Sequence, residues 1–290
     1  MRIRGTGLVA DGASNSASAI LISHYHGDHV QGVERCRPGT PILCSSVTGA
    51  LLTTLAGLPP EQIRALKPGD ATFLHDGEAE ARITALEANH CPGAVMFHIE
   101  TRGRRILYTG DFRLNDAMRR QIAQIAGVDE LYLDATYNDP RYRFPPMETA
   151  IESVLDLMRR RDGRDVLLAV YRIGKNRILE AARREFGYPF YTTKERLRIY
   201  RAIGMADLVT ADRDATPFRA YARGYLEKYF RMGREYREGN FVAIVPTGWA
   251  VDVRPEPGFH YVPYSEHCDY AELQEFREIV QPKRVKLLHG

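Results

Sequence analysis

Hydrophobic and polar residues alternate in short runs along the first 140 residues, a pattern typical of strands separated by turns. The wholly apolar run at 19–22 predicts a buried strand. Further strands are predicted to end near Ser45 and to cover 81–86, 94–99, 105–109 and 128–134, with a helix at 47–56 and a helical turn at 58–61. This part of the chain therefore predicts a layered domain rich in strands.

From residue 145 onward the spacing of apolar residues becomes helical. Helices are predicted over 147–161, from 176 onward, and over 194–203, 217–230 and 270–280, with strands over 166–170, 241–245, 261–264 and 285–288. The order of elements predicts an α/β fold. We expect an αββα-type layered domain formed by residues 1–144 and 249–290, interrupted by an inserted α/β domain at 145–248.

The composition is that of a globular protein, with 44% hydrophobic and 27% charged residues in 290. No apolar run approaches the length of a membrane span, and the N-terminal residues lack a signal-peptide core. The four cysteines show no CxxC pairing, which indicates a reducing compartment. These features predict a cytoplasmic protein of a prokaryotic cell without a membrane partner.

The net charge of +3 is unevenly distributed. Residues 141–240 carry 22 Lys and Arg against 14 Asp and Glu, whereas the rest of the chain is acidic. A basic segment suits a polyanionic substrate, because Lys and Arg neutralise phosphates and release counterions. The charge alone does not distinguish a surface that binds a polyanion from helices whose basic side chains simply face the solvent.

Six of the nine histidines fall into a metal-ligand pattern. The run His24-Tyr25-His26-Gly27-Asp28-His29 places three imidazoles and a carboxylate directly after the buried strand at 19–22. Imidazole nitrogens and carboxylate oxygens are the ligands that zinc takes in catalytic sites. His90 lies in a loop between two strands, and Asp111 ends a strand with a carboxylate free to bridge two ions. The pattern predicts a binuclear metal site.

Two cysteines stand next to candidate site histidines. Cys91 follows His90, and Cys268 follows His267. As chain neighbours of ligands, we expect both thiols to face away from the metal site into the packed interior.

These residues together resemble the metallo-β-lactamase fold, and Asp11 matches its first acidic motif, which supports ligands rather than binding metal. Residues 89–94, 133–138, 171–175, 246–249 and 263–267 are similar to motifs of the β-CASP nucleases of the Artemis and Apollo DNA-repair group. The resemblance implies that the basic insertion is a β-CASP domain, which forms one wall of a nucleic-acid groove in that family.

The resemblance also implies a role for each candidate residue. One metal ion would be held by His24, His26 and His90, and the second by Asp28 and His29, with Asp111 between the two. Asp134 would orient His267, which would act as general acid. His289 stands where the repair enzymes resemble one another in having valine, and a histidine there is similar instead to RNase J, in which it completes the second site.

Four residues are candidates for contact with phosphate or nucleic acid: Tyr137, Arg172, Lys175 and Ser265. Lys175 follows Gly174 at a predicted strand-to-helix junction, a place where backbone N–H groups and an ammonium can meet a terminal phosphate. Arg172 replaces the serine usual in the repair enzymes, and its guanidinium could clamp phosphate or remain a surface cation.

The resulting hypothesis is a metal-dependent nucleic-acid phosphodiesterase that uses a hydroxide nucleophile and forms no covalent intermediate. Its cofactors would be two divalent ions, zinc first, with Mn²⁺ or Mg²⁺ able to support activity. The resemblance implies a 5′→3′ DNA exonuclease that prefers a 5′-phosphate and acts in DNA repair. Alternatives are an RNase J-like RNA nuclease, a small-molecule metallo-hydrolase and a binding module without catalysis.

Overall fold

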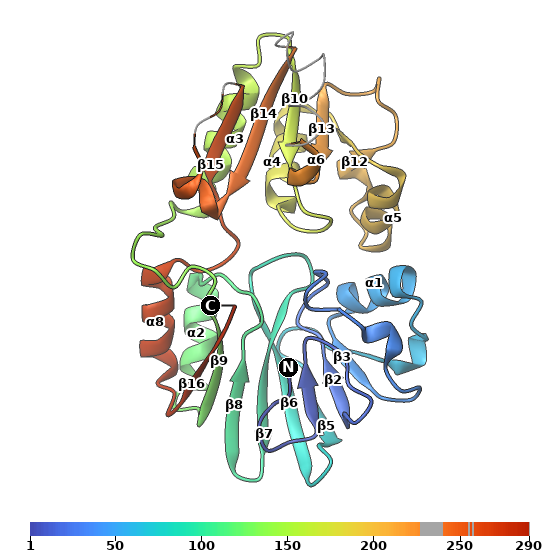
Figure 1. Cartoon of the computed structure of the whole chain (residues 1–290), viewed down its shortest axis with the longest axis vertical. Helices are drawn as coiled ribbons and strands as arrows, with labels where there is room; N and C mark the ends of the chain where they lie inside the picture. The colour runs from blue at the N-terminus through green and yellow to red at the C-terminus, as the bar shows by residue number, and fades with distance from the viewer. Residues whose placement is uncertain (227–239, 255, 257, 290) are drawn as a thin grey trace. The chain divides into compact units, whose positions relative to one another are not determined.

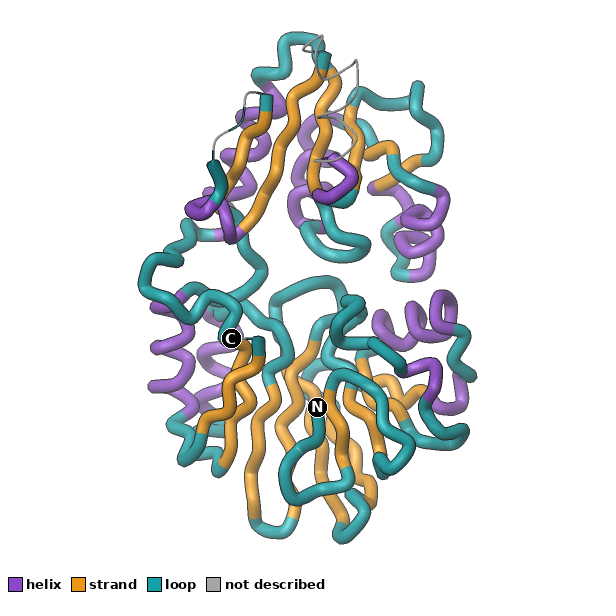
Figure 2. Tube along the Cα trace, viewed as in Figure 1, coloured by secondary structure: helices purple, strands orange, loops and turns teal. Residues whose placement is uncertain are grey.

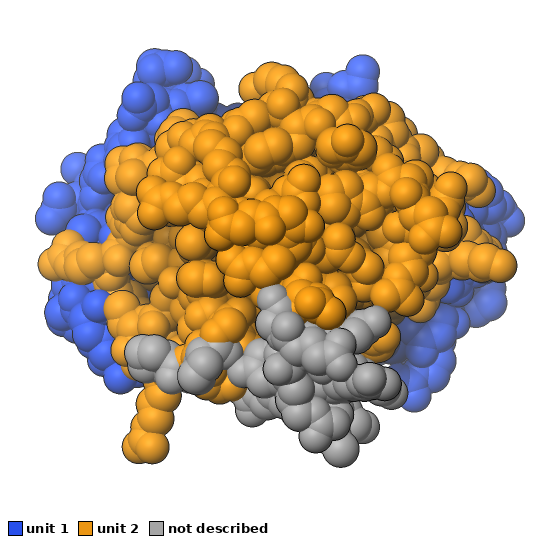
Figure 3. Space-filling model, turned by 90° about the horizontal axis from the view of Figure 1, so that it is seen from above, with its two compact units in different colours: residues 1–141, 266–290 blue, residues 142–265 orange. Residues whose placement is uncertain are grey.

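The structure is a computed structural model that describes residues 1–226, 240–254, 256 and 258–289 (Figure 1). The chain forms two compact units, one built from residues 1–141 and 266–290 and the other from residues 142–265 (Figure 3). Helices flank strands in each unit (Figure 2). These elements confirm the predicted α/β class.

The first unit contains two sheets. Four parallel strands form one sheet in the order β1 (Leu8–Ala10), β2 (Ala19–Leu21), β3 (Ile42–Cys44) and β4 (Ile63–Ala65). Six strands form the other, in the order β16 (Val285–Leu288), β9 (Glu130–Asp134), β8 (Arg104–Tyr108), β7 (Val95–Thr101), β6 (Glu80–Glu87) and β5 (Ala71–His75). In the larger sheet β16, β9 and β8 run parallel, and β8 to β5 run antiparallel.

The two sheets pack face to face through a shared apolar core. Leu21 and Leu43 of the small sheet belong to the same buried cluster as Phe97 and Ile106 of the large one. Helices α2 (Asp116–Ala123) and α8 (Tyr270–Val280) lie side by side and cover the outer face of the large sheet, where Phe276 is fully buried (Figure 1). Helix α1 (Ser46–Ala56) covers the small sheet through Leu52. The layers are therefore α, β, β, α.

Short 3-10 turns complete the first unit: η1 (Val33–Arg35) and η2 (Pro60–Gln62). Helix α8 begins with a capping box, in which Asp269 accepts from the Glu272 N–H and Glu272 accepts from the Asp269 N–H. This cap fixes the start of α8 three residues after His267.

The second unit is built on one parallel sheet of six strands. Their order is β12 (Val209–Thr210), β11 (Phe190–Tyr191), β13 (Phe218–Tyr221), β10 (Asp165–Ala169), β14 (Phe241–Thr247) and β15 (Phe259–Pro263). Its other elements are α3 (Met147–Arg159), α4 (Asn176–Phe186), α5 (Lys194–Ala202), η3 (Ala206–Leu208), α6 (Arg223–Tyr225) and η5 (Gly248–Asp252). The central strands β10 and β14 are almost wholly buried, as expected for a parallel sheet with elements on its faces.

The helix predicted over 217–230 is wrong for its first part and agrees with the structure only at α6 (Arg223–Tyr225). Residues Phe218–Tyr221 form β13, which pairs with β10 and β11, and residues 227–230 lie outside the described part of the chain. Arg219 is buried within this strand, where its guanidinium pairs with Asp165 and lies 5.0 Å from the Phe241 ring centre. The sequence did not predict this strand, because the charged Arg219 interrupts the apolar run that a buried strand usually shows.

Both boundaries between the compact units differ from the predicted domain limits, one slightly and one by many residues. The first unit ends at 141, three residues from the predicted 144, but the second unit extends to 265 rather than 248. The reason is β15, which pairs along its whole length with β14 and so belongs to the second unit.

Within the described part of the chain, no helix combines the length and apolar character that crossing a membrane requires.

Candidate metal centre

The candidate ligands lie where several strands end at the same edge of the first unit. His24 and His26 follow β2, and His90 lies in the connection from β6 to β7. Asp111 follows β8, and His289 follows β16. Because β6, β8, β9 and β16 share one direction, their carboxyl ends lie at one edge of the sheet.

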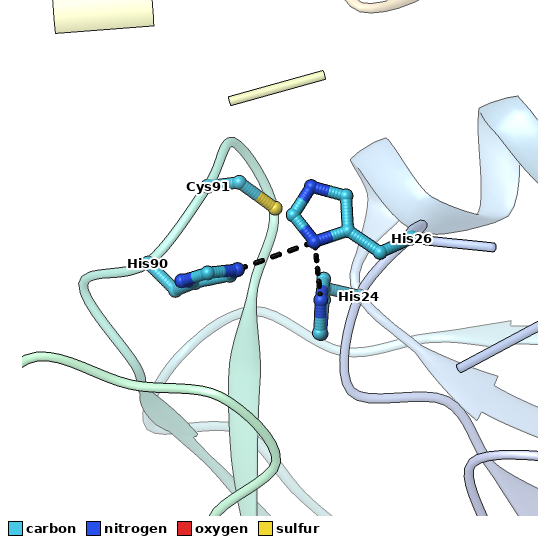
Figure 4. A group of neighbouring side chains, drawn as sticks. All are labelled: His24, His26, His90 and Cys91. Carbon is cyan, nitrogen blue, oxygen red and sulfur yellow. Dashed lines mark hydrogen bonds between the residues drawn. The ribbon is translucent and has the colours of Figure 1, made fainter. Parts of the chain in front are cut away.

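Three imidazoles converge on one point from two segments of the chain (Figure 4). Nδ1 of His26 lies 2.8 Å from Nε2 of His24 and 3.3 Å from Nε2 of His90. Two nitrogens bound to one zinc ion at 2.0–2.1 Å in tetrahedral geometry are about 3.3 Å apart. The three nitrogens therefore have the separation of a metal-binding set.

Asp111 lies at the centre of the histidines and is almost fully buried. The distances from its carboxylate oxygens to imidazole Nε2 atoms are 3.6 Å for His24, 3.3 Å for His29, 3.7 Å for His90, 3.9 Å for His267 and 3.7 Å for His289. His289 faces Oδ1, and the other four face Oδ2. Oδ2 therefore lies near histidines of both ligand groups and Oδ1 lies near His289 of the second group, so the carboxylate is within reach of both groups.

A second group contains Asp28, His29 and His289, whose ligand atoms lie within 4.8 Å of one another. The Asp28 carboxylate is 3.5 Å from Nε2 of His29, and the interaction with this imidazole lowers the pKa of Asp28 to about 2. Strand β16 extends to Leu288, whose carbonyl accepts from the Ala135 N–H. The strand pairing places His289 beside the other ligands.

Asp11 supports two of these histidines without belonging to any of the ligand groups. Its carboxylate accepts from the Ser23 hydroxyl (2.6 Å), the His29 imidazole (2.7 Å) and the Tyr108 hydroxyl (2.9 Å). A carboxylate only accepts, so Nδ1 of His29 carries a proton and Nε2 is the atom that points into the cluster. The Ser23 hydroxyl, which donates to Asp11, lies 2.9 Å from Nδ1 of His24. Through Ser23, Asp11 therefore also orients the His24 ring, with its Nε2 directed into the cluster.

The protonation states of His24, His90 and Asp111 fit a cation in this place. His29 differs, because burial alone would lower its pKa but Asp11, Asp111 and Asp28 outweigh burial and raise it to about 12. Burial and then the neighbouring His26 hold the pKa of His24 well below its usual value, and burial and then His267 do the same for His90. Burial alone would raise the pKa of Asp111, but the surrounding imidazoles, His267 first, hold it well below its usual range. Neutral imidazoles and an ionised carboxylate are the forms that bind metal.

Two buried atoms of the cluster have no hydrogen-bond partner among the described residues: Nε2 of His29 and Oδ1 of Asp111. Buried polar atoms are almost always paired, and an ion is one of the accepted explanations for an exception. With the nitrogen and oxygen donors around them, these atoms fit a site for divalent ions such as zinc.

His267 and Asp134 form a hydrogen-bonded pair beside the ligands. Nδ1 of His267 donates to Asp134 at 2.8 Å, and the other carboxylate oxygen accepts from the Thr136 backbone (3.0 Å) and hydroxyl (2.7 Å). Burial alone would lower the pKa of His267, but Asp134 and Asp111 outweigh it and raise the pKa to about 9. The Tyr137 ring lies edge-on to His267, with centres 5.8 Å apart.

The predicted phosphate contacts lie mostly in the second unit and differ in exposure. Arg172 is exposed and pairs with Glu195. Lys175 is buried, and its ammonium donates to the Ala169 carbonyl at 3.4 Å and to the Pro246 carbonyl at 2.5 Å. Lys175 therefore links β10 to β14, which sequence reasoning did not anticipate. Ser265 is also buried.

Sequence reasoning missed the residues that support the candidate ligands. Asp11 is held in place by Ser23 and Tyr108, and Asp134 is held by Thr136. In the sequence, the only indication of these supporting roles is that Ser23 precedes His24 and that Thr136 follows Asp134 by two residues. Cys91, which we expected to face into the packed interior, belongs to the buried apolar cluster with Met96 and Phe112, and its sulfur also lies within 4.8 Å of the ligand nitrogens of the first histidine group.

The two-sheet layers and the histidine–carboxylate cluster define a class of protein, and sequence comparison agrees with it. Residues 9–170 match the β-lactamase superfamily domain, and the chain belongs to that superfamily. Residues 206–286 match the DNA repair metallo-β-lactamase family. The chain is thus a metallo-β-lactamase domain combined with a DNA repair metallo-β-lactamase (β-CASP) domain, as the sequence motifs implied.

Several relatives are similar over nearly the whole chain. The mouse protein named 5′ exonuclease Apollo is 32% identical over 278 residues, covering 94% of this chain and 51% of the relative. The Arabidopsis thaliana DNA cross-link repair protein SNM1 is 30% identical, covering 98% and 64%, and the human DNA cross-link repair 1A protein is 28% identical, covering 98% and 30%. The chain spans about half the length of the Apollo protein that it matches.

A crystal structure of a protein from Enterococcus faecalis has the same fold. It matches with a TM-score of 0.67 at 16% identity, covering 94% of this chain and 75% of that one. This likeness concerns the fold alone.

Proposed function

We propose that the protein is a metal-dependent nucleic-acid phosphodiesterase, and specifically a 5′→3′ DNA exonuclease that prefers a 5′-phosphate. The observation that carries this proposal is the placement of Asp111 between two groups of histidines, next to the His267–Asp134 pair. The names of the relatives, a 5′ exonuclease and DNA cross-link repair proteins, support DNA as the substrate.

In this proposal His24, His26 and His90 hold one divalent ion, and Asp28, His29 and His289 hold a second, with Asp111 shared. Bound divalent ions supply Lewis-acid chemistry toward a phosphodiester and its attacking water. The remaining chemistry belongs to side chains. Asp11 keeps the nitrogens of His24 and His29 directed into the site, and the buried Asp111 carboxylate holds the two ligand groups together.

His267 is proposed as the general acid. Asp134 accepts the Nδ1 proton, so the second proton of the imidazolium is carried at Nε2, the nitrogen that lies 3.9 Å from Asp111. A pKa of about 9 keeps that proton in place at neutral pH, ready for the leaving oxygen. Asp134 acts through His267 and is a positioning residue.

The test uses single strands labelled at the 3′ end, as DNA and RNA, each with a 5′-phosphate or a 5′-hydroxyl. Wild type with added zinc or manganese is compared with Asp28→Ala, Asp111→Asn and the surface control Asp116→Asn, whose side chain is 88% exposed. Shortening from the 5′ end of phosphorylated DNA, lost in both site variants and kept in the control, is the expected result. Activity of Asp111→Asn equal to wild type would refute the metal centre.

An RNase J-like RNA nuclease is the second candidate, and one observation favours it. His289 lies 3.7 Å from Oδ1 of Asp111, close enough to complete the second ligand group. If RNA is cut faster than DNA and His289→Val abolishes the cutting, this candidate replaces the DNA exonuclease.

A further inference from the structure

Exposed aromatic rings are concentrated in the second unit. Within the described part of the chain, five aromatic side chains are exposed, and four of these lie in that unit. They are Tyr171, Tyr188, Tyr225 and Trp249, with exposed fractions of 55%, 46%, 43% and 38%. The same unit holds almost all of the basic segment 141–240. Aromatic rings set among arginines and lysines are typical of surfaces that bind single-stranded nucleic acid.

Three of these four rings stand at the same edge of the parallel sheet. Tyr225 follows β13 in helix α6, Tyr171 follows β10 by two residues, and Trp249 follows β14 by two residues. Strands β13, β10 and β14 are direct neighbours and run parallel, so their carboxyl ends lie side by side (Figure 1). Tyr188 instead precedes β11 by two residues and so lies at the opposite edge.

Two of the three rings are backed by another aromatic ring. The Tyr225 ring stacks on that of Tyr221, with ring centres 4.8 Å apart and an angle of 25° between the planes. The Trp249 ring meets the Tyr142 ring edge-on at 5.3 Å, and the Tyr142 hydroxyl donates to the Asp252 carboxylate at 2.8 Å. Tyr142 is buried and Tyr221 is half-buried, so both exposed rings are held against the body of the unit.

The third ring, that of Tyr171, is held through buried cations. The Lys175 ammonium lies 4.6 Å from its centre and also donates to carbonyls of β10 and β14. Arg196 of α5 donates to a carbonyl of β13 at 2.7 Å and to that of Val170, directly after β10, at 3.4 Å. These two side chains tie the ends of β13, β10 and β14 together, which keeps the three rings in a row.

The row matches the dimensions and the charge of a single strand of nucleic acid. Neighbouring strands of a sheet lie about 4.8 Å apart, so the ends of β13, β10 and β14 span about 10 Å. That is the length of roughly three nucleotides at about 3.4 Å each. Arg172 follows Tyr171, and Arg223 stands two residues before Tyr225, so cations are available to the phosphates of a strand whose bases lie on the rings.

We propose that Tyr225, Tyr171 and Trp249 form a platform on which unpaired bases of a single strand stack. The proposal rests on the proposed function and adds how the strand is held. Every base has a π-face, so the platform accepts any sequence. A base within a duplex is already stacked and paired, so the platform selects strands whose bases are unpaired.

Binding to abasic strands tests the platform, because such strands keep the phosphates and lack the bases. Fluorescence anisotropy measures the affinity of the full chain, with added zinc, for two labelled single strands of equal length, one normal and one abasic. Both carry a 5′-phosphate and phosphorothioate linkages, which slow cleavage.

Wild type is compared with Tyr171→Leu, Tyr225→Leu and Trp249→Leu, and with Tyr171→Phe and Tyr225→Phe, which keep an aromatic ring. The matched control is Tyr188→Leu, since Tyr188 is an exposed tyrosine of the same unit at the opposite edge of the sheet.

We expect wild type to bind the normal strand more tightly than the abasic one. Each leucine substitution in the platform should weaken binding of the normal strand by about 5–150-fold, the range for loss of one base–aromatic stack, and leave the affinity for the abasic strand unchanged. Tyr188→Leu and the two phenylalanine variants should bind both strands as wild type does.

Equal affinity of wild type for the two strands would overturn the platform, and cleavage of DNA by the same protein would leave the proposed function standing. Losses of equal size for both strands in the leucine variants would also overturn it, because a stacking ring acts on bases alone. Failure of wild type to bind either strand would contradict the proposed function itself.

Discussion

At the scale of single residues, the site depends on groups that lie outside the proposed ligand sets. The Asp11 carboxylate accepts three side-chain hydrogen bonds, and two of these run directly or through Ser23 to His29 and His24. Tyr108, the third donor, has its pKa raised by burial and by Asp11, so it stays a neutral O–H donor. One buried acid thus sets the tautomers of ligands for both proposed ions.

Asp11→Asn is expected to weaken zinc binding by about 10–100-fold, because an amide no longer demands a proton on Nδ1 of His29. Competition with a chromogenic chelator measures the affinity. The matched control is Asp162→Asn, since Asp162 has a similar positive φ (49° against 42°) and lies in the second unit. An affinity unchanged in Asp11→Asn would show that the imidazoles are oriented by packing alone.

His267 gives a prediction on pH. Its pKa of about 9 means that the acid form persists at neutral pH and is lost as the pH rises through about 9, so cleavage should fall on the alkaline side. Asp134→Asn removes the negative partner and lowers the pKa of His267, which moves this alkaline fall to lower pH. Rates across the pH range, on natural substrate and on one with a good leaving group, measure the shift.

His267→Gln should cost about 10²–10⁴-fold on the natural substrate and much less with the good leaving group, which does not need a proton. An equal loss on both substrates would indicate that His267 binds metal instead.

At the scale of elements, strand ends and their tight turns position the carboxylates. Gly110 lies between β8 and Asp111 with φ of 51°, and a Cβ atom there would come within 2.5 Å of the Ser23 Cβ. The turn therefore brings the end of β8 against the segment that carries His24. A side chain at this point would separate the two segments.

Gly110→Ala should lower the free energy of unfolding by about 1–3 kcal/mol more than Gly103→Ala does. Gly103 has φ of 69°, and a Cβ atom added there would have no other atom within 4 Å, so it shares the backbone strain without the clash. Denaturant unfolding of both variants measures the difference, and zinc affinity should fall only in Gly110→Ala. Equal destabilisation by the two substitutions would mean that Ser23 moves aside freely.

Helices and strands with a regular spacing of apolar residues could be predicted from the sequence. A strand that depends on pairing with strands distant in the sequence could not. The helices at Met147–Arg159 and Tyr270–Val280 and the strand at Val285–Leu288 were predicted closely, because their apolar spacing is regular. Strand Phe218–Tyr221 was missed, because its centre holds Arg219, whose charge pairs with Asp165, a residue 54 positions away in the sequence on the neighbouring strand β10.

The same distinction applies to the site. The sequence motifs named the histidines and carboxylates that the structure brings together, because those residues stand directly after strands. The hydrogen bonds of Asp11 to Ser23 and Tyr108, and the direction of the Cys91 thiol, depend on the packing of separate segments. Residue order alone does not contain that information.

At the scale of the whole molecule, charge is divided along the chain, and the basic segment 141–240 lies almost wholly in the second unit. If that unit binds nucleic acid, affinity should fall steeply with salt, because each neutralised phosphate releases counterions. Among the predicted phosphate contacts, Arg172 is exposed, so it can be substituted without disturbing the packed interior.

Arg172→Ala should reduce the slope of log affinity against log salt by about 0.7 for single-stranded DNA. Fluorescence anisotropy in the presence of a chelator measures binding without cleavage. Arg184→Ala, another exposed arginine of the same unit, is the control. The same change in slope for both variants would indicate diffuse attraction rather than a contact at Arg172.

The first unit is assembled from two stretches of chain separated by the whole of the second unit. Strand β16 and helix α8, with His267 and His289, are therefore the last parts of the described chain to leave the ribosome. A nascent chain carries the histidines of the first ligand group long before it carries the proposed general acid. Under the proposed function, cleavage therefore requires the second stretch of the first unit to be added and folded against the first.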